Sequence, residues 1–256
     1  MSVDALYAHL RSGVTHTCYC WVISRRDGVV LGFTDHDASL HFDDVTFAPQ
    51  NGLSARAIAS TTGLSVNNTE AFGVLSDDAI AEADILAGRY DGAAVQVWLV
   101  CWDDVTARKT LFRGTLGEIT RGASGFEAEL HGLTEALNQV QGRSYLKTCS
   151  AVLGDRRCRF DLAHASYRLD YVLDAKPDGQ VFALAAVENF NAGWFESGQL
   201  EVLSGPAAGL RGAIKSDVGA QDRVLTLWAP LNAQLSVGDT IRVTAGCDKR
   251  PVTCRE

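Results

Sequence analysis

The stretch KTCSAVLGDRRCRF, residues 147–160, and a second stretch, GCDKRPVTC, residues 246–254, decide how this chain is organised. Each stretch holds a pair of cysteines: Cys149 and Cys158 in the first, Cys247 and Cys254 in the second. The residues between the two pairs are enough for a small domain. Two cysteine pairs that flank a domain-sized segment predict a four-thiolate site at the base of that domain.

Four thiolates suit either zinc or an iron–sulfur cluster. Structural zinc sites usually present cysteines as tight pairs, with about two to four residues between them, because both sulfurs must reach one small ion. Here eight residues separate the first pair and six separate the second, which favours a larger cubic cluster whose corners lie farther apart. Basic residues flank both pairs and would stabilise the negative charge of either metal site, so charge does not choose between the metals.

A disulfide is the rival interpretation of these four cysteines. The chain has seven cysteines, an odd number. Its first residues lack the basic-then-apolar pattern of a signal peptide, and a chain of this length does not need disulfide staples. We therefore prefer the metal site. The remaining cysteines, Cys18, Cys20 and Cys101, lie in apolar runs typical of strands and are predicted to be small core residues.

The composition is that of an ordinary globular protein, with 46% apolar and 21% charged residues. Its 256 residues allow one large or two ordinary domains. The net charge of −8 argues against a general affinity for nucleic acid, because phosphate binding needs a basic surface. No apolar stretch approaches the length needed to span a bilayer.

Residues 1–148 predict a β-rich domain with short helices. Strand patterns, rich in β-branched and aromatic residues, occupy residues 17–24, 29–33, 40–47, 93–102, 110–121 and 126–131. Asp43 and Asp44 divide the third of these into two short strands. Helices are predicted over residues 4–11, from a cap at Ser76 to about Ala87, and over residues 133–139.

Residues 149–256 predict a second domain that is nearly all β. Short strands are expected at residues 167–173, 180–185, 198–203, 213–217, 224–227 and 240–244. Many short strands separated by glycine-rich turns are typical of a small barrel or sandwich. The predicted fold class is therefore mainly β with a few short helices (α+β), in two β-barrel or sandwich domains joined by the four-cysteine site.

Asp35, His36 and Asp37 form the string most easily mistaken for a catalytic or metal site. They follow a predicted strand, and a polar turn fixed by side-chain-to-backbone hydrogen bonds is the preferred interpretation. Residues 205–212 resemble a phosphate loop but lack its Gly-Lys-Ser/Thr ending, and this interpretation is rejected. Trp194 and the phenylalanine that follows it are interpreted as core residues.

Two runs of residues carry a resemblance to a known family. The first is LGFTDHD, residues 31–37, continued by LHFDDVTFAP, residues 40–49; the second is AGCDKR, residues 245–250, with Cys254. They resemble a tail-tip family found in alphaproteobacterial prophages and gene transfer agents, and the resemblance covers nearly the whole chain. That family includes the baseplate hub of gene transfer agents. It is similar in role to the tail-tip protein of lambda-like siphophages, which carries an iron–sulfur cluster on C-terminal cysteines.

The resemblance implies a structural virion protein of the tail tip, built from tail-tube-like β domains and assembled in the bacterial cytoplasm. It implies a homotrimer that joins the distal tail protein ring to the central tip or fibre protein, around a channel through which DNA passes without specific binding. The ligands of a [4Fe–4S] cluster would be Cys149, Cys158, Cys247 and Cys254. Relatives usually continue past the last cysteine with a basic, aromatic segment, whereas two residues follow Cys254 here.

Two other functions stay open at this point. An intracellular metal-dependent enzyme could use the region around His36, which would require a pocket of convergent polar groups and carboxylates with shifted pKa values. A zinc-stabilised binding module would contain zinc and no sulfide in the purified protein.

Overall fold

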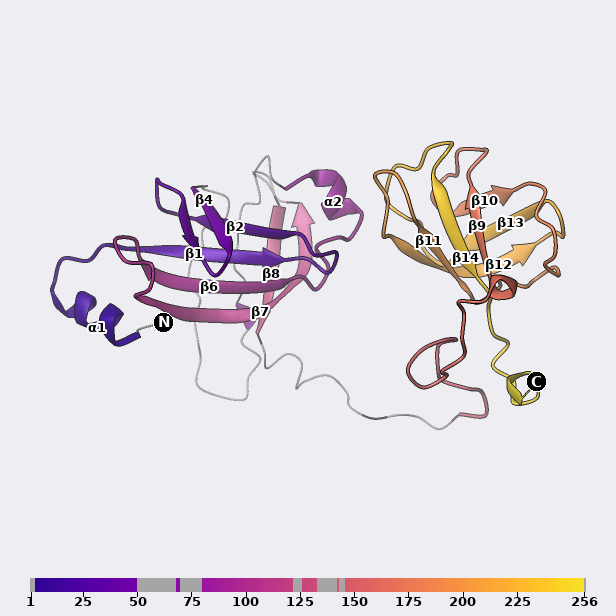
Figure 1. Ribbon diagram of the computed structural model, residues 1–256, viewed down its shortest axis with the longest axis horizontal. Coiled ribbons are helices and arrows are strands. Elements are labelled where there is room, and N and C mark those ends of the chain that lie inside the picture. The colour runs from indigo at the N-terminus through magenta and orange to yellow at the C-terminus, as the bar shows by residue number, and fades with distance from the viewer. Residues whose placement is uncertain are drawn as a thin grey trace. The chain divides into compact units, whose positions relative to one another are not determined.

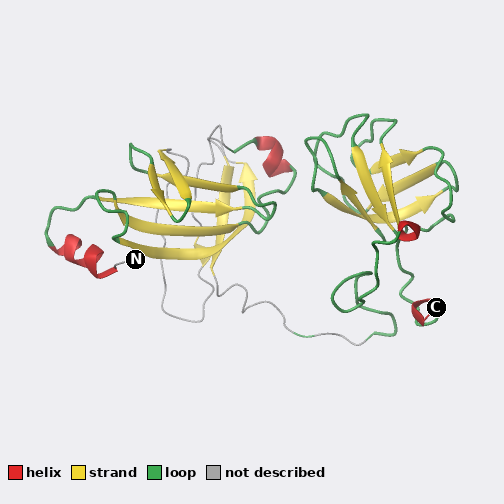
Figure 2. Cartoon of the chain, in the orientation of Figure 1, coloured by secondary structure: helices red, strands yellow, loops and turns green. Residues whose placement is uncertain are grey.

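The computed structural model describes residues 3–49, 68–69, 80–121, 126–132, 142 and 146–255. The chain divides into two compact units, Met1–Gln141 and Gly142–Glu256. Both are built mainly from strands, and the helices among the described residues are short (Figure 1, Figure 2). The division falls slightly before the boundary at residues 148 and 149 that the cysteine pattern predicted, so both cysteine pairs belong to the second unit.

The first unit holds a sheet of eight strands in the order β3-β4-β2-β1-β6-β7-β8-β5. The strands are β1 (Thr17–Ser24), β2 (Val30–Thr34), β3 (Leu40–Phe42), β4 (Val45–Pro49), β5 (Asn68–Thr69), β6 (Ala94–Cys101), β7 (Arg108–Arg121) and β8 (Phe126–Gly132). Strands β1 and β2, and likewise β7 and β8, follow one another in the chain and pair antiparallel. Asp43 and Asp44 have φ values of 51° and 58° and form the tight turn between β3 and β4.

Two α-helices lie in the described part of this unit. Helix α1 covers Val3–Arg11 and confirms the first predicted helix. Helix α2 covers Glu82–Leu86 and begins after Ala81, whereas the predicted cap, Ser76, lies outside the described residues, as does the predicted helix over residues 133–139. Helix α2 ends in a Schellman motif at Gly88, whose φ is +71°. No helix in the described ranges has both the length and the apolar character needed to cross a membrane.

Strand β1 is buried on both faces, which explains its nearly unbroken apolar sequence. One face supplies Trp21 and Ile23 to a cluster that includes Phe33, Tyr90 and Val97. The opposite face supplies Cys18, Cys20 and Val22 to a cluster beneath β3 and β4. Cys101 is buried separately, against Leu6 of α1. The prediction that these three cysteines are core residues is therefore confirmed.

The second unit holds an antiparallel sheet of six strands in the order β10-β13-β12-β11-β14-β9. The strands are β9 (Arg168–Val172), β10 (Val181–Leu184), β11 (Gln199–Val202), β12 (Arg211–Val218), β13 (Arg223–Leu227) and β14 (Thr240–Thr244). Short 3₁₀ turns lie at η1 (Ala165–Tyr167) and η2 (Thr253–Arg255). Every strand predicted for this half of the chain is found.

The six strands share a single core, which makes the sheet barrel-like. Alternate residues of β10 to β14 point inward and are almost fully buried: Phe182, Leu184, Leu200, Val202, Ile214, Leu225, Leu227, Ile241 and Val243. Leu169 and Tyr171 of β9 pack against the same cluster. A sheet whose strands all meet in one cluster must curl around it. The predicted fold class, mainly β with a few short helices, is confirmed for both units.

Candidate cofactor site in the second unit

The strand pairing of the second unit brings the two cysteine segments together. Strand β9 pairs antiparallel with β14, and Arg168 lies opposite Thr244. Because the chain enters β9 and leaves β14 at the same end of the sheet, the segments before Arg168 and after Thr244 extend from that end side by side (Figure 1). They line a cavity of about 710 Å³, and its wall includes all four predicted ligands: Cys149, Cys158, Cys247 and Cys254.

The first cysteine segment is folded around the carboxylate of Asp155. One oxygen, Oδ1, accepts hydrogen bonds from the backbone N–H of Cys158 at 2.7 Å and of Arg157 at 2.8 Å. The other, Oδ2, accepts from the backbone N–H of Val152 at 3.0 Å. These backbone donors, Cys158 first, hold the pKa of Asp155 below its ordinary value. A single acidic side chain thus shapes the loop that presents Cys158.

Lys249 joins the two cysteine segments. Its backbone N–H donates to Sγ of Cys247 at 3.4 Å. Its carbonyl accepts from the backbone N–H of Cys149 at 3.2 Å, and its ammonium group donates to the carbonyl of Ala151. Lys249, which lies between Cys247 and Cys254 in the sequence, therefore hydrogen-bonds directly to the segment that carries the first cysteine pair.

All four cysteines are free thiols with access to solvent. Cys149 and Cys254 are exposed, and Cys158 and Cys247 are half-buried. Within the described ranges, no three cysteine, histidine or acidic side chains converge on one ion-sized point. All four thiols lie in the wall of one cavity.

Aromatic side chains cover the sheet side of the cavity. Trp194 stacks on Tyr167, with ring centroids 6.4 Å apart, and Phe160 meets Tyr167 edge-on at 4.8 Å. The indole N–H of Trp194 is buried and has no hydrogen-bond partner. A buried donor without an acceptor carries a desolvation cost.

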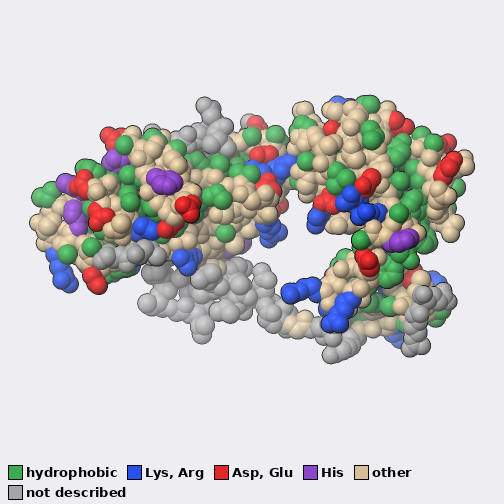
Figure 3. Space-filling model, viewed as in Figure 1, with side chains coloured by type: hydrophobic (Ala, Val, Ile, Leu, Met, Phe, Trp, Pro, Cys, Tyr) green, Lys and Arg blue, Asp and Glu red, His purple; other side chains and the backbone are tan. Residues whose placement is uncertain are grey.

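Charged side chains of both signs line the cavity. Arg159, Lys249 and Arg250 are basic, Glu196 and Asp248 are acidic, and basic side chains also gather over the loops below the second sheet (Figure 3). Four thiolates carry more negative charge than a zinc ion or a cubic cluster neutralises, so nearby cations stabilise either one. Four thiols and three cations in the wall of one cavity fit a four-thiolate site, and they do not choose between zinc and an iron–sulfur cluster.

The Asp35-His36-Asp37 string is a polar turn, as predicted. The Oδ1 atom of Asp35 accepts from the backbone N–H of Tyr19 at 2.7 Å, and Nδ1 of His36 accepts from the backbone N–H of Ala38 at 3.0 Å. These side-chain-to-backbone bonds fix the chain between β2 and β3. The side chains of Asp35 and His36 thus hold the turn, and the side chain of Asp37 is 96% exposed.

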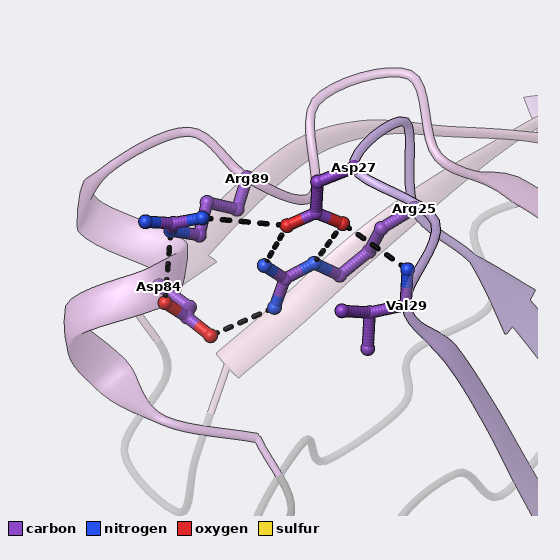
Figure 4. Close-up of polar contacts among 5 residues, drawn as sticks. All are labelled: Arg25, Asp27, Val29, Asp84 and Arg89. Carbon is purple, nitrogen blue, oxygen red and sulfur yellow. Dashed lines mark hydrogen bonds and ion pairs between the residues drawn. The ribbon is translucent and has the colours of Figure 1, made fainter. Parts of the chain in front are cut away.

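The sequence did not predict a cluster of ion pairs at the β1–β2 turn of the first unit. Figure 4 shows the guanidinium of Arg25 between the carboxylates of Asp27 and Asp84, with Arg89 bridging the same two acids. The Arg25 side chain is only 5% exposed, and its bond to Asp27 lowers the pKa of that carboxyl to about 2. The cluster ties the hairpin to α2 and has an architectural role.

Comparisons with known proteins identify the family. The family described as "Baseplate hub protein, N-terminal attachment domain" matches residues 3–161, more than half of the chain, and "Phage conserved hypothetical protein BR0599" matches residues 193–256. No curated protein matches. A solved chain from "Virion of native gene transfer agent (GTA) particle" is 53% identical, with a TM-score of 0.91, over 98% of this chain and 87% of that chain.

These matches indicate a structural phage-type protein, so the metal-dependent enzyme suggested as an alternative is wrong. The predicted resemblance to a tail-tip family is confirmed by two separate family matches, one in each half of the chain. The chain belongs to the baseplate hub protein family.

Proposed function

We propose that this chain is the baseplate hub of a gene transfer agent or of a siphophage-like tail, with a structural role at the virion tail tip. The observation that carries the proposal is the solved virion chain, which is 53% identical over nearly the whole chain. Co-purification tests it. The protein should travel with assembled tail particles through a density gradient, and a protein found only free in the producing cells would contradict the proposal.

The assembly we propose is a homotrimer around a channel, placed between the distal tail protein ring and the central tip protein. Two β-rich units per chain support this, because three copies could arrange such units around one axis. Mass measurement of the isolated tip complex is the test. A monomer or a dimer in that complex would end the trimer proposal.

We further propose that Cys149, Cys158, Cys247 and Cys254 hold a [4Fe–4S] cluster. The cluster would cross-link the segment before β9 to the segment after β14 and so close a long loop of the second unit. The chain's own residues prepare this site. Asp155 shapes the first loop, Lys249 bonds the two segments, and its backbone N–H already donates to a ligand sulfur, Sγ of Cys247.

Analysis of protein purified without oxygen tests the cofactor. We expect about four irons and four acid-labile sulfides per chain. Replacing any one of the four cavity cysteines with serine should lower iron content, whereas Cys101→Ser should not, because Cys101 is buried against α1 of the first unit. Purified protein that contains zinc and no sulfide would contradict the cluster and support the zinc-stabilised module. Loss of iron in Cys101→Ser would show that the ligand assignment is wrong.

A further inference from the structure

A fully buried ion pair lies behind the cysteine cavity. The side chains of Asp217, near the end of β12, and Arg223, at the start of β13, are both 0% exposed, and Nη1 of Arg223 donates to Oδ2 of Asp217 at 2.6 Å. Charged side chains are almost never buried so completely unless they are paired. The pair lies inside the core of the second unit, where the neighbouring inward positions are apolar.

The ion pair is bonded to the backbone of one loop, residues 190–195. Arg223 Nη2 donates to the carbonyl of Asn191 at 2.8 Å and to that of Phe190, and Asp217 Oδ2 accepts from the backbone N–H of Phe195 at 3.0 Å. The guanidinium also lies 5.2 Å from the ring centroid of Phe195. Both ends of this loop are therefore fixed by one pair of side chains.

The same loop forms a wall of the cysteine cavity. Gly193 and Trp194 line the cavity directly. The carbonyl of Trp194 accepts from the backbone N–H of Gly246 at 3.0 Å, and Gly246 immediately precedes Cys247. Direct contacts therefore lead from the ion pair, through the loop, to one of the proposed ligands.

Stability alone does not explain why this pair is present. Burying two charges costs several kcal/mol per ion before their attraction is counted, and apolar residues of similar volume are often as stable or more stable. In addition, Oδ1 of Asp217 and Nε of Arg223 are buried without hydrogen-bond partners. Unlike an apolar pair, Asp217 and Arg223 can hydrogen-bond three backbone groups of the loop, the carbonyls of residues 190 and 191 and the N–H of residue 195, and hold them in one geometry.

We infer that Asp217 and Arg223 are positioning residues of the cysteine site: they fix the loop 190–195 and thereby hold Cys247 at the cavity. The inference rests on the proposed function of the four cysteines as cofactor ligands. Outer-shell groups bonded directly to a ligand typically change metal affinity by about 10- to 100-fold when they are removed; this pair acts through the loop, so we expect the lower end of that range.

The test compares the full chain with a double variant, Asp217→Leu with Arg223→Met, which replaces the pair by apolar residues. A second variant, Arg223→Lys, keeps the charge but loses the planar fork that spans the loop carbonyls and the carboxylate. The matched control is Arg211→Lys, because Arg211 also pairs with an acid, Glu201, but on the exposed face of β12.

Each protein is loaded with ferrous iron and sulfide without oxygen, and iron release to a ferrous chelator is timed. Circular dichroism and the melting temperature report folding. We expect both ion-pair variants to stay folded and to release iron about tenfold faster than wild type, with Arg211→Lys unchanged. A folded double variant that releases iron at the wild-type rate would overturn the inference. If the double variant does not fold, the iron-release rate of Arg223→Lys decides: a folded Arg223→Lys variant that releases iron at the wild-type rate would overturn the inference.

A second measurement does not depend on the cofactor. In reduced, iron-free protein, alkylation of each cysteine is followed by mass spectrometry. Release of the loop should speed alkylation of Cys247 severalfold and leave Cys158 unchanged, because Cys158 is held by Asp155. Equal rates for Cys247 in wild type and both variants would overturn the inference. Wild-type protein that takes up no iron would contradict the proposed cluster. The alkylation rate of Cys247 would then still test, by itself, whether the ion pair positions this cysteine.

Discussion

Replacing Gly246 with alanine should separate the segment after β14, which carries Cys247, from the loop beside it. A β-carbon at this position would stand 1.6 Å from the carbonyl oxygen of Glu196, 2.6 Å from its carbonyl carbon and 2.9 Å from the backbone nitrogen of Gly198. All three of these neighbours are backbone atoms, which cannot rotate away as a side chain can. The two segments would have to move apart by more than about 1 Å to reach ordinary van der Waals separation.

The free-energy cost of this movement has two parts. The hydrogen bond from Gly246 to the carbonyl of Trp194, 3.0 Å long, would break, at about 1 kcal/mol. Forced separation of packed segments adds about 1–3 kcal/mol. A total of about 2–4 kcal/mol should lower the melting temperature of the second unit by roughly 10–20 °C.

Thermal unfolding followed by circular dichroism measures this effect, with Gly212→Ala as the control. Gly212, on β12 of the same unit, would place its new β-carbon 2.6 Å from Cδ1 of Leu227, which is the end of a side chain and not backbone. We expect a cost of about 1 kcal/mol for this variant. Equal melting temperatures for Gly246→Ala and wild type would refute the close approach of the two backbones.

Three more predictions concern other parts of the chain. Asp27→Asn should lower the free energy of unfolding by about 1 kcal/mol at pH 7, a value reduced for solvent screening. The difference between wild type and the variant should vanish as the pH falls from 3.8 through about 2, because Asp27 then becomes protonated in the folded protein as well. Urea unfolding of both proteins at pH 7 and at about pH 2 measures it. Phe182→Ala, in the fully buried core of the second unit, should cost about 3–5 kcal/mol of its unfolding free energy by the same method. The purified protein should not bind duplex DNA tightly at physiological ionic strength, and salt-sensitive binding in a filter or anisotropy assay would contradict this.

Most strands could be predicted because their signal is local. Strand β1 is rich in aromatic and β-branched residues, and β13 alternates buried and exposed positions, so neither depends on a distant partner for recognition. The turn at Asp35 to Asp37 was likewise predictable, because its side chains bond to backbone groups within and beside it. The start of α2 was not, since no side-chain cap marks Ala81.

The shared cavity of the four cysteines could be predicted only in outline. Spacing along the chain suggested that two thiol pairs bracket a domain, but it gave no reason for the two pairs to meet. They meet because β9 and β14, the first and last strands of the second unit, are neighbours with Arg168 opposite Thr244. That pairing joins residues far apart in sequence, and the strand pattern alone contains no information about it.

The Asp217–Arg223 pair shows where a regular strand pattern misleads. Counting alternate residues back from Leu227 and Leu225 correctly places Arg223 on the inward face of β13. The same counting forward from Ile214 would place Asp217 on the outward face of β12. A register shift between Ile214 and Ser216 inserts one extra residue, so that Asp217 lies opposite Leu225 and points inward. The bulge thus creates the buried partner that Arg223 needs, and a change that restored regular pairing would leave the arginine buried alone.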